Sequence, residues 1–185
     1  MRGMRTCPRN TGGDGVSYKQ TKVLVDTNLW IDKYIPHRPT SEASREVLRL
    51  CASDDIALLY PMRSLADVFW QVTRDRKNWL RREYGEITEA QARAVNADAW
   101  ACVDNMMEVG APVGADVSDV WIAQHLRDMH PDFEDDMVLA VVRRAGVDYL
   151  VTSDRQLIQK ADVVALTPED MLTVLRNRRA LQGDC

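Results

Sequence analysis

The chain reads Lys22-Val23-Leu24-Val25-Asp26-Thr27-Asn28 near its N-terminus, an apolar, β-branched run that ends in polar residues. Such a run indicates a buried strand. A similar run, Leu150-Val151-Thr152-Ser153-Asp154, also ends in an aspartate. Short buried strands that alternate with helices are typical of a parallel sheet covered on both faces. We therefore expect Asp26 and Asp154 at the same edge of one sheet, where parallel strands end.

Apolar runs and helical patterns alternate over the rest of the chain. The runs predict strands at residues 22–26, 56–60, 111–113, 149–152 and 163–166. Capping signals and apolar spacing predict helices that begin near residues 40, 64, 88, 118, 135 and 167. Thr88 with Gln91 forms a capping box, and Thr167 before Pro168 marks the last helix. The predicted fold class is α/β, with a central parallel sheet flanked by helices in three α/β/α layers.

Composition restricts the class of protein. The 185 residues include 24 Lys and Arg against 28 Asp and Glu, a formal net charge of −4, and 45% are hydrophobic. This hydrophobic share is enough for a core and excludes a chain that is disordered throughout. No apolar stretch approaches the roughly 18 to 20 residues of a membrane helix. The negative net charge does not exclude a nucleic-acid partner, because the positions of the charges matter more than their sum.

The ends of the chain differ from its middle. We expect a flexible tail over residues 1–21, one domain over residues 22–176 with a helical elaboration at residues 71–110, and a second tail over residues 177–185, where the last helix frays. The first tail lacks the apolar segment of a secretory signal. The four cysteines lie far apart and form no CxxC pair. These features predict a cytoplasmic protein with reduced thiols.

Two further aspartates belong to the same edge of the predicted sheet. Asp135 opens the helix that leads into the strand before Asp154, and Asp67 lies in the first turns of the helix after residues 56–60. Four carboxylates at one edge repel one another, and a hard divalent cation removes the conflict. Mg²⁺ and Mn²⁺ prefer carboxylate oxygens and water, and no His or Cys cluster in the sequence competes for the ion. Such an ion turns water into a nucleophile against a phosphate ester.

Three segments in this order resemble the PIN domain family: residues 22–29, residues 64–68 and residues 132–154. The distinctive parts are Asp-Thr-Asn after the first strand and Asp135, which stands 19 residues (154 − 135) before Asp154. The resemblance spans about residues 22–175. It implies a metal-dependent endoribonuclease similar to the VapC toxins of bacterial toxin–antitoxin pairs. Mg²⁺ or Mn²⁺ would be the cofactor, RNA the substrate and an antitoxin the partner, and homodimers are common in the family.

The resemblance also implies roles for individual residues. The catalytic carboxylates of the family correspond to Asp26, Asp67, Asp135 and Asp154. The metal ligands among them correspond to Asp26, Asp135 and Asp154, and Asp67 stands where the family usually has Glu. The supporting polar residues correspond to Thr27, Asn28, Thr152 and Ser153. Residues 71–110 are longer than the same region of a minimal VapC toxin.

A basic stretch interleaved with Trp79 and Tyr84 is a candidate surface for RNA, where cations bind phosphates and aromatic rings stack on unpaired bases. Its cations are Arg74, Arg76, Lys77, Arg81 and Arg82. The alternative is an ordinary solvated helix face. Four tryptophans are expected in the core or at an interface, namely Trp30, Trp70, Trp100 and Trp121. Five other acids are expected at the surface, with an alternative role for Glu134 or Asp136 in supporting the metal ligands, namely Asp116, Asp119, Asp132, Glu134 and Asp136.

Two other functions are compatible with the same residues. One is a non-catalytic PIN-like module that binds RNA or a protein without cutting. The other is an enzyme that uses Asp26 as a nucleophile. Phosphatases of that kind need a second aspartate where this chain has Asn28, which disfavours the second alternative.

Overall fold

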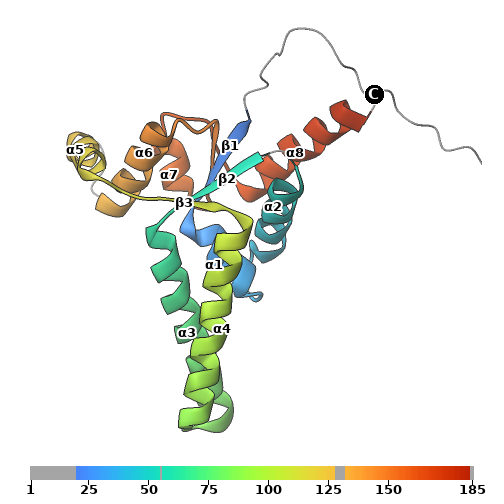
Figure 1. The fold of residues 1–185 in the computed structure, drawn as a ribbon, viewed down its shortest axis with the longest axis vertical. Coiled ribbons are helices and arrows are strands. Elements are labelled where there is room, and N and C mark those ends of the chain that lie inside the picture. The colour runs from blue at the N-terminus through green and yellow to red at the C-terminus, as the bar shows by residue number, and fades with distance from the viewer. Residues whose placement is uncertain (1–19, 55, 128–131, 184–185) are drawn as a thin grey trace, which may run out of the picture.

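The computed structural model describes residues 20–54, 56–127 and 132–183. Within them, five parallel strands form one sheet in the order β3-β2-β1-β4-β5 (Figure 1). The strands are β1 (Thr21–Val25), β2 (Ile56–Pro61), β3 (Ala111–Val113), β4 (Tyr149–Val151) and β5 (Ala165–Leu166). Strand β1 lies in the centre, with Val23 opposite Leu58 on one side and Tyr149 on the other. The predicted central parallel sheet is confirmed.

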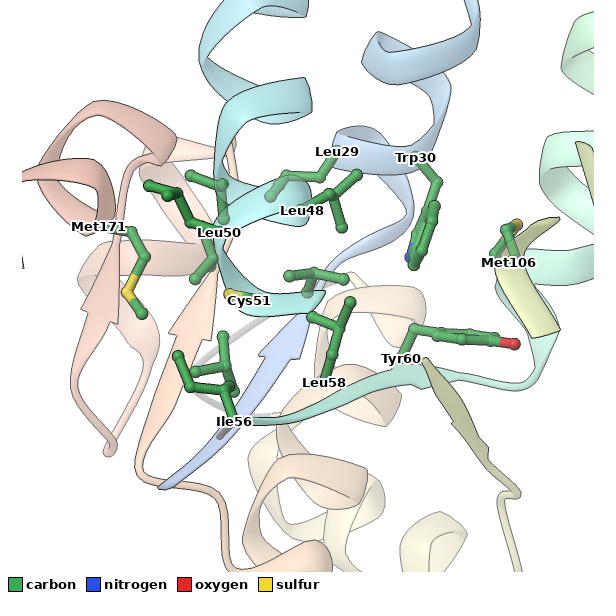
Figure 2. Close-up of a cluster of buried hydrophobic side chains, with 14 of the residues drawn as sticks. Leu29, Trp30, Leu48, Leu50, Cys51, Ile56, Leu58, Tyr60, Met106 and Met171 are labelled. Atoms are coloured by element: carbon green, nitrogen blue, oxygen red, sulfur yellow. The ribbon is translucent and has the colours of Figure 1, made fainter. Parts of the chain in front are cut away.

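Helices cover both faces of this sheet. They are α1 (Thr27–Tyr34), α2 (Ser41–Ser53), α3 (Arg63–Tyr84), α4 (Glu89–Val109), α5 (Val117–Leu126), α6 (Phe133–Ala145), α7 (Arg155–Lys160) and α8 (Pro168–Gly183). Val23 and Val25 of β1 point into a core shared with α1 to α4 and α8, of which Figure 2 shows the centre. Leu24, between them, points into a second core with α5, α6 and α7. The alternation along β1 therefore separates two cores and confirms the three-layer α/β/α architecture.

Helices α3 and α4 lie side by side and extend away from the sheet as an arm (Figure 1). The turn between them begins at Gly85, which has φ of 80°, and α4 starts at the expected capping box of Thr88 and Gln91. We expected a helix from about residue 64, and α3 continues through the whole basic stretch to Tyr84. An arm of two helices has no third layer to cover it, so its outer side chains stay in solvent.

Of the four tryptophans expected in the core or at an interface, Trp30 is a core residue, since it is fully buried. Trp70 is 57% exposed, Trp100 59% and Trp121 65%, so these three are not core residues and only the interface alternative remains for them. Trp100 packs on Phe69 across the arm, and Trp121 packs on His125 of its own helix. Whether they reach a partner stays a prediction.

Several local expectations are corrected. Helices α1 and α7 were not expected, because each begins directly after a strand-end aspartate and is short. Helix α5 is capped by Asp116, not by Ser118, since the Asp116 side chain accepts from the Ser118 amide at 2.7 Å. Helix α6 starts at Phe133, two residues before the expected start at Asp135. Helix α8 continues to Gly183, although we expected it to fray from Arg176.

Two acids that were expected at the surface are buried. The Asp119 side chain has no exposed area and accepts two hydrogen bonds of 2.9 Å from the guanidinium of Arg144 on α6. The same carboxylate accepts from the backbone amide of Asp116. Asp136 is 2% exposed. The Asp119–Arg144 pair therefore fastens α5 to α6, a contact between residues 25 positions apart that no local pattern predicts.

The described part of the chain contains no helix that is both long and apolar enough to cross a membrane. Cys51 and Cys102 are free thiols, and burial raises the pKa of the Cys51 thiol to about 12. Cys7 and Cys185 lie outside the described residues, as does most of the tail expected at residues 1–21.

Candidate active site

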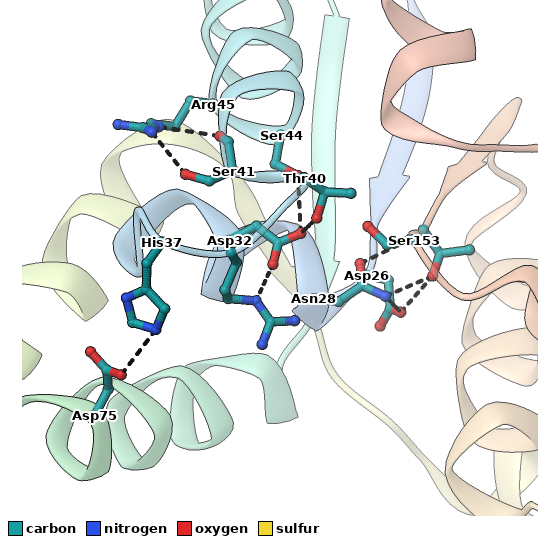
Figure 3. A network of polar contacts seen from close by, with 12 residues as sticks. Asp26, Asn28, Asp32, His37, Thr40, Ser41, Ser44, Arg45, Asp75 and Ser153 are labelled. Carbon is teal, nitrogen blue, oxygen red and sulfur yellow. Dashed lines mark hydrogen bonds and ion pairs between the residues drawn. The ribbon is translucent and has the colours of Figure 1, made fainter. Parts of the chain in front are cut away.

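Asp26 lies immediately after β1, and its carboxylate caps α1. Oδ1 accepts from the Thr27 amide at 2.6 Å. Oδ2 accepts from Asn28 Nδ2 and from Thr152 Oγ1, both at 2.8 Å. Asn28 Oδ1 in turn accepts from the Ser153 amide at 3.2 Å (Figure 3). The polar residues that follow β1 and β4 therefore hold the Asp26 carboxylate in one orientation.

The electrostatic environment favours the neutral form of Asp26. Burial raises the pKa of its carboxyl to about 6, although hydrogen bonds from Thr152 and Thr27 act in the opposite direction. The negative charges of Asp135 and Asp154 add to the increase. The pKa of Asp135 is also raised, mainly by burial and by the charge of Asp132. A cation bound among these carboxylates would relieve this destabilisation of the charged forms.

A pocket of about 640 Å³ opens at this edge of the sheet, and Asp26, Asp67 and Asp135 all line it. Asp67 comes from the second turn of α3, and Asp135 from the first turn of α6. Asp154 is exposed and does not line the pocket, but its charge acts on both Asp26 and Asp135. Three of the four expected carboxylates thus share one pocket, and the fourth lies close beside it.

Asp154 also caps a helix. Its Oδ1 accepts from the amides of Gln156 and Leu157 at 2.7 and 3.2 Å, and so caps α7. Its own amide donates to Thr152 Oγ1 at 3.0 Å. Thr152 is therefore hydrogen-bonded both to the Asp26 carboxylate and to the backbone of Asp154.

Two cations hold the acidic groups of the pocket. Arg63 binds Asp67 at 3.2 Å and reaches across to Glu134 of α6 at 2.5 Å. Lys160 of α7 binds Asp135 at 3.4 Å. Sequence analysis missed both cations. The i,i+4 spacing of Arg63 and Asp67 is a readable signal, whereas Lys160 reaches Asp135 only through the tertiary fold.

The donor set fits a hard cation. The four expected side chains, Asp26, Asp67, Asp135 and Asp154, are all carboxylates, the oxygen ligands that Mg²⁺ and Mn²⁺ prefer. Beside Asp154, Ser153 Oγ is buried and has no hydrogen-bond partner among the described residues. Within the same residues, however, no three His, Cys, Asp or Glu side chains stand close enough to form a ready-made metal site. An ion held by three of these carboxylates at once would require them to move toward one another.

The five candidate RNA-binding cations all lie on α3 of the arm. Arg74 contacts a residue of the pocket wall, since its guanidinium lies 4.5 Å from the centre of the Trp70 ring. The others are Arg76, Lys77, Arg81 and Arg82, and none of them lines the pocket. The structure therefore separates this stretch from the carboxylates along the helix axis.

The chain was compared with protein-family models, curated sequences and solved structures. A family model described as PIN domain matches residues 22–156. The fold is similar to VapBC2 from Rickettsia felis bound to a DNA fragment from their promoter, with a TM-score of 0.56, 11% identity, and coverage of 80% of this chain and 98% of that chain. It is also similar to VapC20 from Mycobacterium tuberculosis, a sarcin–ricin loop cleaving toxin, with a TM-score of 0.50, 16% identity, and coverage of 74% and 93%.

A third similar structure is a protein from Pyrobaculum aerophilum, with a TM-score of 0.51, 15% identity, and coverage of 89% of this chain and 97% of that chain. No curated protein sequence matches the chain. At identities this low, the three structures establish the fold alone.

Proposed function

Since the chain belongs to the PIN domain family, whose model matches residues 22–156, we propose that it is a metal-dependent endoribonuclease. The observation that carries the proposal is the pocket lined by Asp26, which follows β1, by Asp67 of α3 and by Asp135 of α6. Asp26 caps a helix, but Asp67 and Asp135 do not. Helix capping therefore does not explain why three carboxylates from separate segments surround one pocket. Several carboxylates around one pocket are the ligands that cation-assisted phosphodiester hydrolysis requires.

Asp26, Asp135 and Asp154 would hold Mg²⁺ or Mn²⁺, and Asp67 would complete the ligand set or orient the attacking water. A bound ion supplies positive charge to the phosphate and lowers the pKa of water. Asn28 and Thr152 keep Oδ2 of Asp26 in place through hydrogen bonds of 2.8 Å. Arg63 lines the pocket and is 56% exposed, so it would be able to bind a phosphate after leaving Glu134. The products would carry a 5′-phosphate and a 3′-hydroxyl, as the family resemblance implies.

The test is cleavage of RNA by the full chain with Mg²⁺ or Mn²⁺ and with EDTA. Asp26→Asn should abolish metal-dependent cleavage while the circular dichroism spectrum stays unchanged. Asp98→Asn is the matched control, because Asp98 is exposed on α4, away from the pocket lining. Full activity of Asp26→Asn would exclude this site as the catalytic centre.

We further propose that the protein is the toxin of a toxin–antitoxin pair that acts in the cytoplasm. The support is the similarity to VapBC2, a toxin–antitoxin complex by its name, and to VapC20, a cleaving toxin. The free thiols of Cys51 and Cys102 fit a reducing compartment. An antitoxin would then occlude the carboxylate pocket, and a short gene next to that of this chain should encode it. Homodimer formation stays a prediction.

A non-catalytic PIN-like module is the second candidate, and one observation favours it. Arg63 and Lys160 already neutralise Asp67 and Asp135, and the described carboxylates are not gathered into a ready-made site. RNA binding without cleavage under any divalent ion would decide for this candidate.

A further inference from the structure

The wall of the carboxylate pocket contains two large aromatic side chains that remain in solvent. Trp70 of α3 is 57% exposed, and Phe133 at the start of α6 is 59% exposed. Both line the same pocket as Asp26, Asp67 and Asp135. Exposed aromatic rings beside a catalytic pocket offer flat apolar surface on which a planar ligand group can stack.

Trp70 is already held in place by a cation. The guanidinium of Arg74 lies 4.5 Å from the centre of the indole ring, and its Nη2 donates to Gln71 Oε1 at 2.5 Å. The guanidinium over the ring restrains the indole, and 57% of the Trp70 side chain remains exposed to a ligand. This combination of an oriented aromatic ring and an adjoining cation suits a nucleotide, which presents a base and a phosphate together.

The helical spacing of α3 extends this arrangement along the arm. An α-helix turns by about 100° per residue, so Arg74 lies roughly 20° and Arg81 roughly 40° from Asp67 around the axis. Arg76, nine residues after Asp67, lies about 180° away, on the opposite side of the helix. The row of Asp67, Trp70, Arg74 and Arg81 therefore runs down one face, and it extends about 21 Å from the pocket, at about 1.5 Å per residue.

The cations of this row are available for an anionic partner. Both Arg74 and Arg81 are exposed, and within the described part of the chain neither is paired with a carboxylate. Arg74 is bonded to Gln71, and Arg81 to Asn78 at 3.4 Å. Arg63, in contrast, already binds Asp67 and Glu134. Phosphates next to the acidic pocket need cations of this kind to offset repulsion by the carboxylates.

We infer that an unpaired strand of RNA leaves the pocket along this face of α3, with one base stacked at Trp70 and the following phosphates bound by Arg74 and Arg81. The inference rests on the proposed ribonuclease function and assigns its substrate path. It limits the candidate basic stretch to Arg74 and Arg81, which lie on the same face of α3 as Asp67. Base stacking on Trp70 requires a base that is free of its complement, so the strand must be single-stranded there.

The experiment measures binding without cleavage. Full-length protein carrying Asp26→Asn is titrated in EDTA against a short fluorescein-labelled RNA, single-stranded or annealed to its complement, and followed by fluorescence anisotropy. Trp70→Ala should weaken single-strand binding about tenfold, the usual loss for one stacked base, and Trp70→Phe should keep most of the affinity. Single-stranded RNA should bind more tightly than the duplex. Thermal melts identify any variant that fails to fold. The preference for single-stranded over duplex RNA is measured on the protein that carries Asp26→Asn alone, so it tests the inference whether or not Trp70→Ala folds.

Arg81→Gln tests the phosphate contacts against Arg76→Gln, the same substitution on the opposite face. Arg81→Gln should reduce the slope of log K against log salt by about 0.7, the value for one phosphate contact on a single strand. Arg76→Gln should leave the slope unchanged. Equal effects of the two substitutions, equal affinity for the duplex, or unaltered binding by Trp70→Ala would overturn the inference. Since no step requires cleavage, RNA that binds through Trp70 but is never cut would refute the proposed function and leave this path standing.

Discussion

Thr152 Oγ1 donates a hydrogen bond of 2.8 Å to Asp26 Oδ2. The two residues are 126 positions apart in the chain, yet they follow neighbouring parallel strands, β1 and β4. Thr152 is fully buried and also accepts from Asn28 Nδ2 at 2.9 Å and from the Asp154 amide at 3.0 Å. One hydroxyl group therefore connects the two strand-end motifs and fixes the position of the first carboxylate.

Thr152→Val should weaken metal binding without unfolding the protein. Valine keeps the shape of threonine but removes the hydrogen bond, and loss of a group that orients a metal ligand typically costs about 10- to 100-fold in affinity. Burial raises the pKa of Asp26 to about 6, and the Thr152 bond restrains a further increase. The pH at which Mn²⁺ begins to bind should therefore rise in the variant.

Titration calorimetry at several pH values measures both effects, and Thr152→Ser, which keeps the hydroxyl, should bind Mn²⁺ within a few-fold of the parent. The same loss in both variants would contradict this role.

Asp26 should make the metal-free protein less stable as the pH rises. Its pKa is about 6 in the folded state against 3.8 for the free side chain, so the folded state binds more protons between these values. The contribution is fully present below about pH 4 and is lost as the pH rises through about 6, a change of about 3 kcal/mol. Asp26→Asn has no such titration. Urea denaturation in EDTA should show the variant gaining about 3 kcal/mol over the parent across this interval.

A gain that is independent of pH would exclude Asp26 as the group responsible. Asp98→Asn, on the exposed face of α4, is the control and should follow the parent at every pH.

The sheet and the two strand-end aspartates could be predicted because their signals are local. An apolar run followed by Asp26 or by Asp154 is readable within a few residues, and parallel pairing then brings their ends to one edge. Helices α1 and α7 could not be predicted in the same way. Each has at most eight residues, too few for a clear helical period, and the side chain that caps each one was interpreted only as a site residue.

The contacts that complete the pocket depend on tertiary structure. Lys160 meets Asp135 only because α7 lies next to the start of α6, and Glu134 meets Arg63 across a pocket that separates α6 from α3. Charged residues of these types are most often solvated, which is why sequence reasoning placed Glu134 and Asp119 at the surface. The interpretation was correct for Glu134, which is 68% exposed, and wrong for Asp119, which is 0% exposed.

Asp119→Asn should destabilise the fold. The substitution removes the charge from a side chain with no exposed area and weakens two hydrogen bonds of 2.9 Å from Arg144. Because the Arg144 side chain is 31% exposed, water solvates the guanidinium that loses its partner, so the expected cost is that of lost buried hydrogen bonds, about 1 to 3 kcal/mol. Glu134→Gln is the matched control, since the Glu134–Arg63 pair is 68% and 56% exposed and should contribute less than about 1 kcal/mol. Urea denaturation of both variants measures the difference. Equal losses would show that Arg144 finds another partner when Asp119 is neutral.

Lys160→Gln should strengthen metal binding. The ammonium of Lys160 lies 3.4 Å from Asp135 Oδ2, and both side chains are 18% exposed, so the cation occupies a carboxylate that the metal would use. Its removal frees that oxygen and takes one positive charge away from the site, which at about 1 kcal/mol corresponds to an increase in Mn²⁺ affinity of about fivefold. Lys77→Gln makes the same charge change on α3, outside the pocket lining, and should leave Mn²⁺ affinity unchanged. Weaker binding by Lys160→Gln would mean instead that the lysine positions Asp135 for the ion.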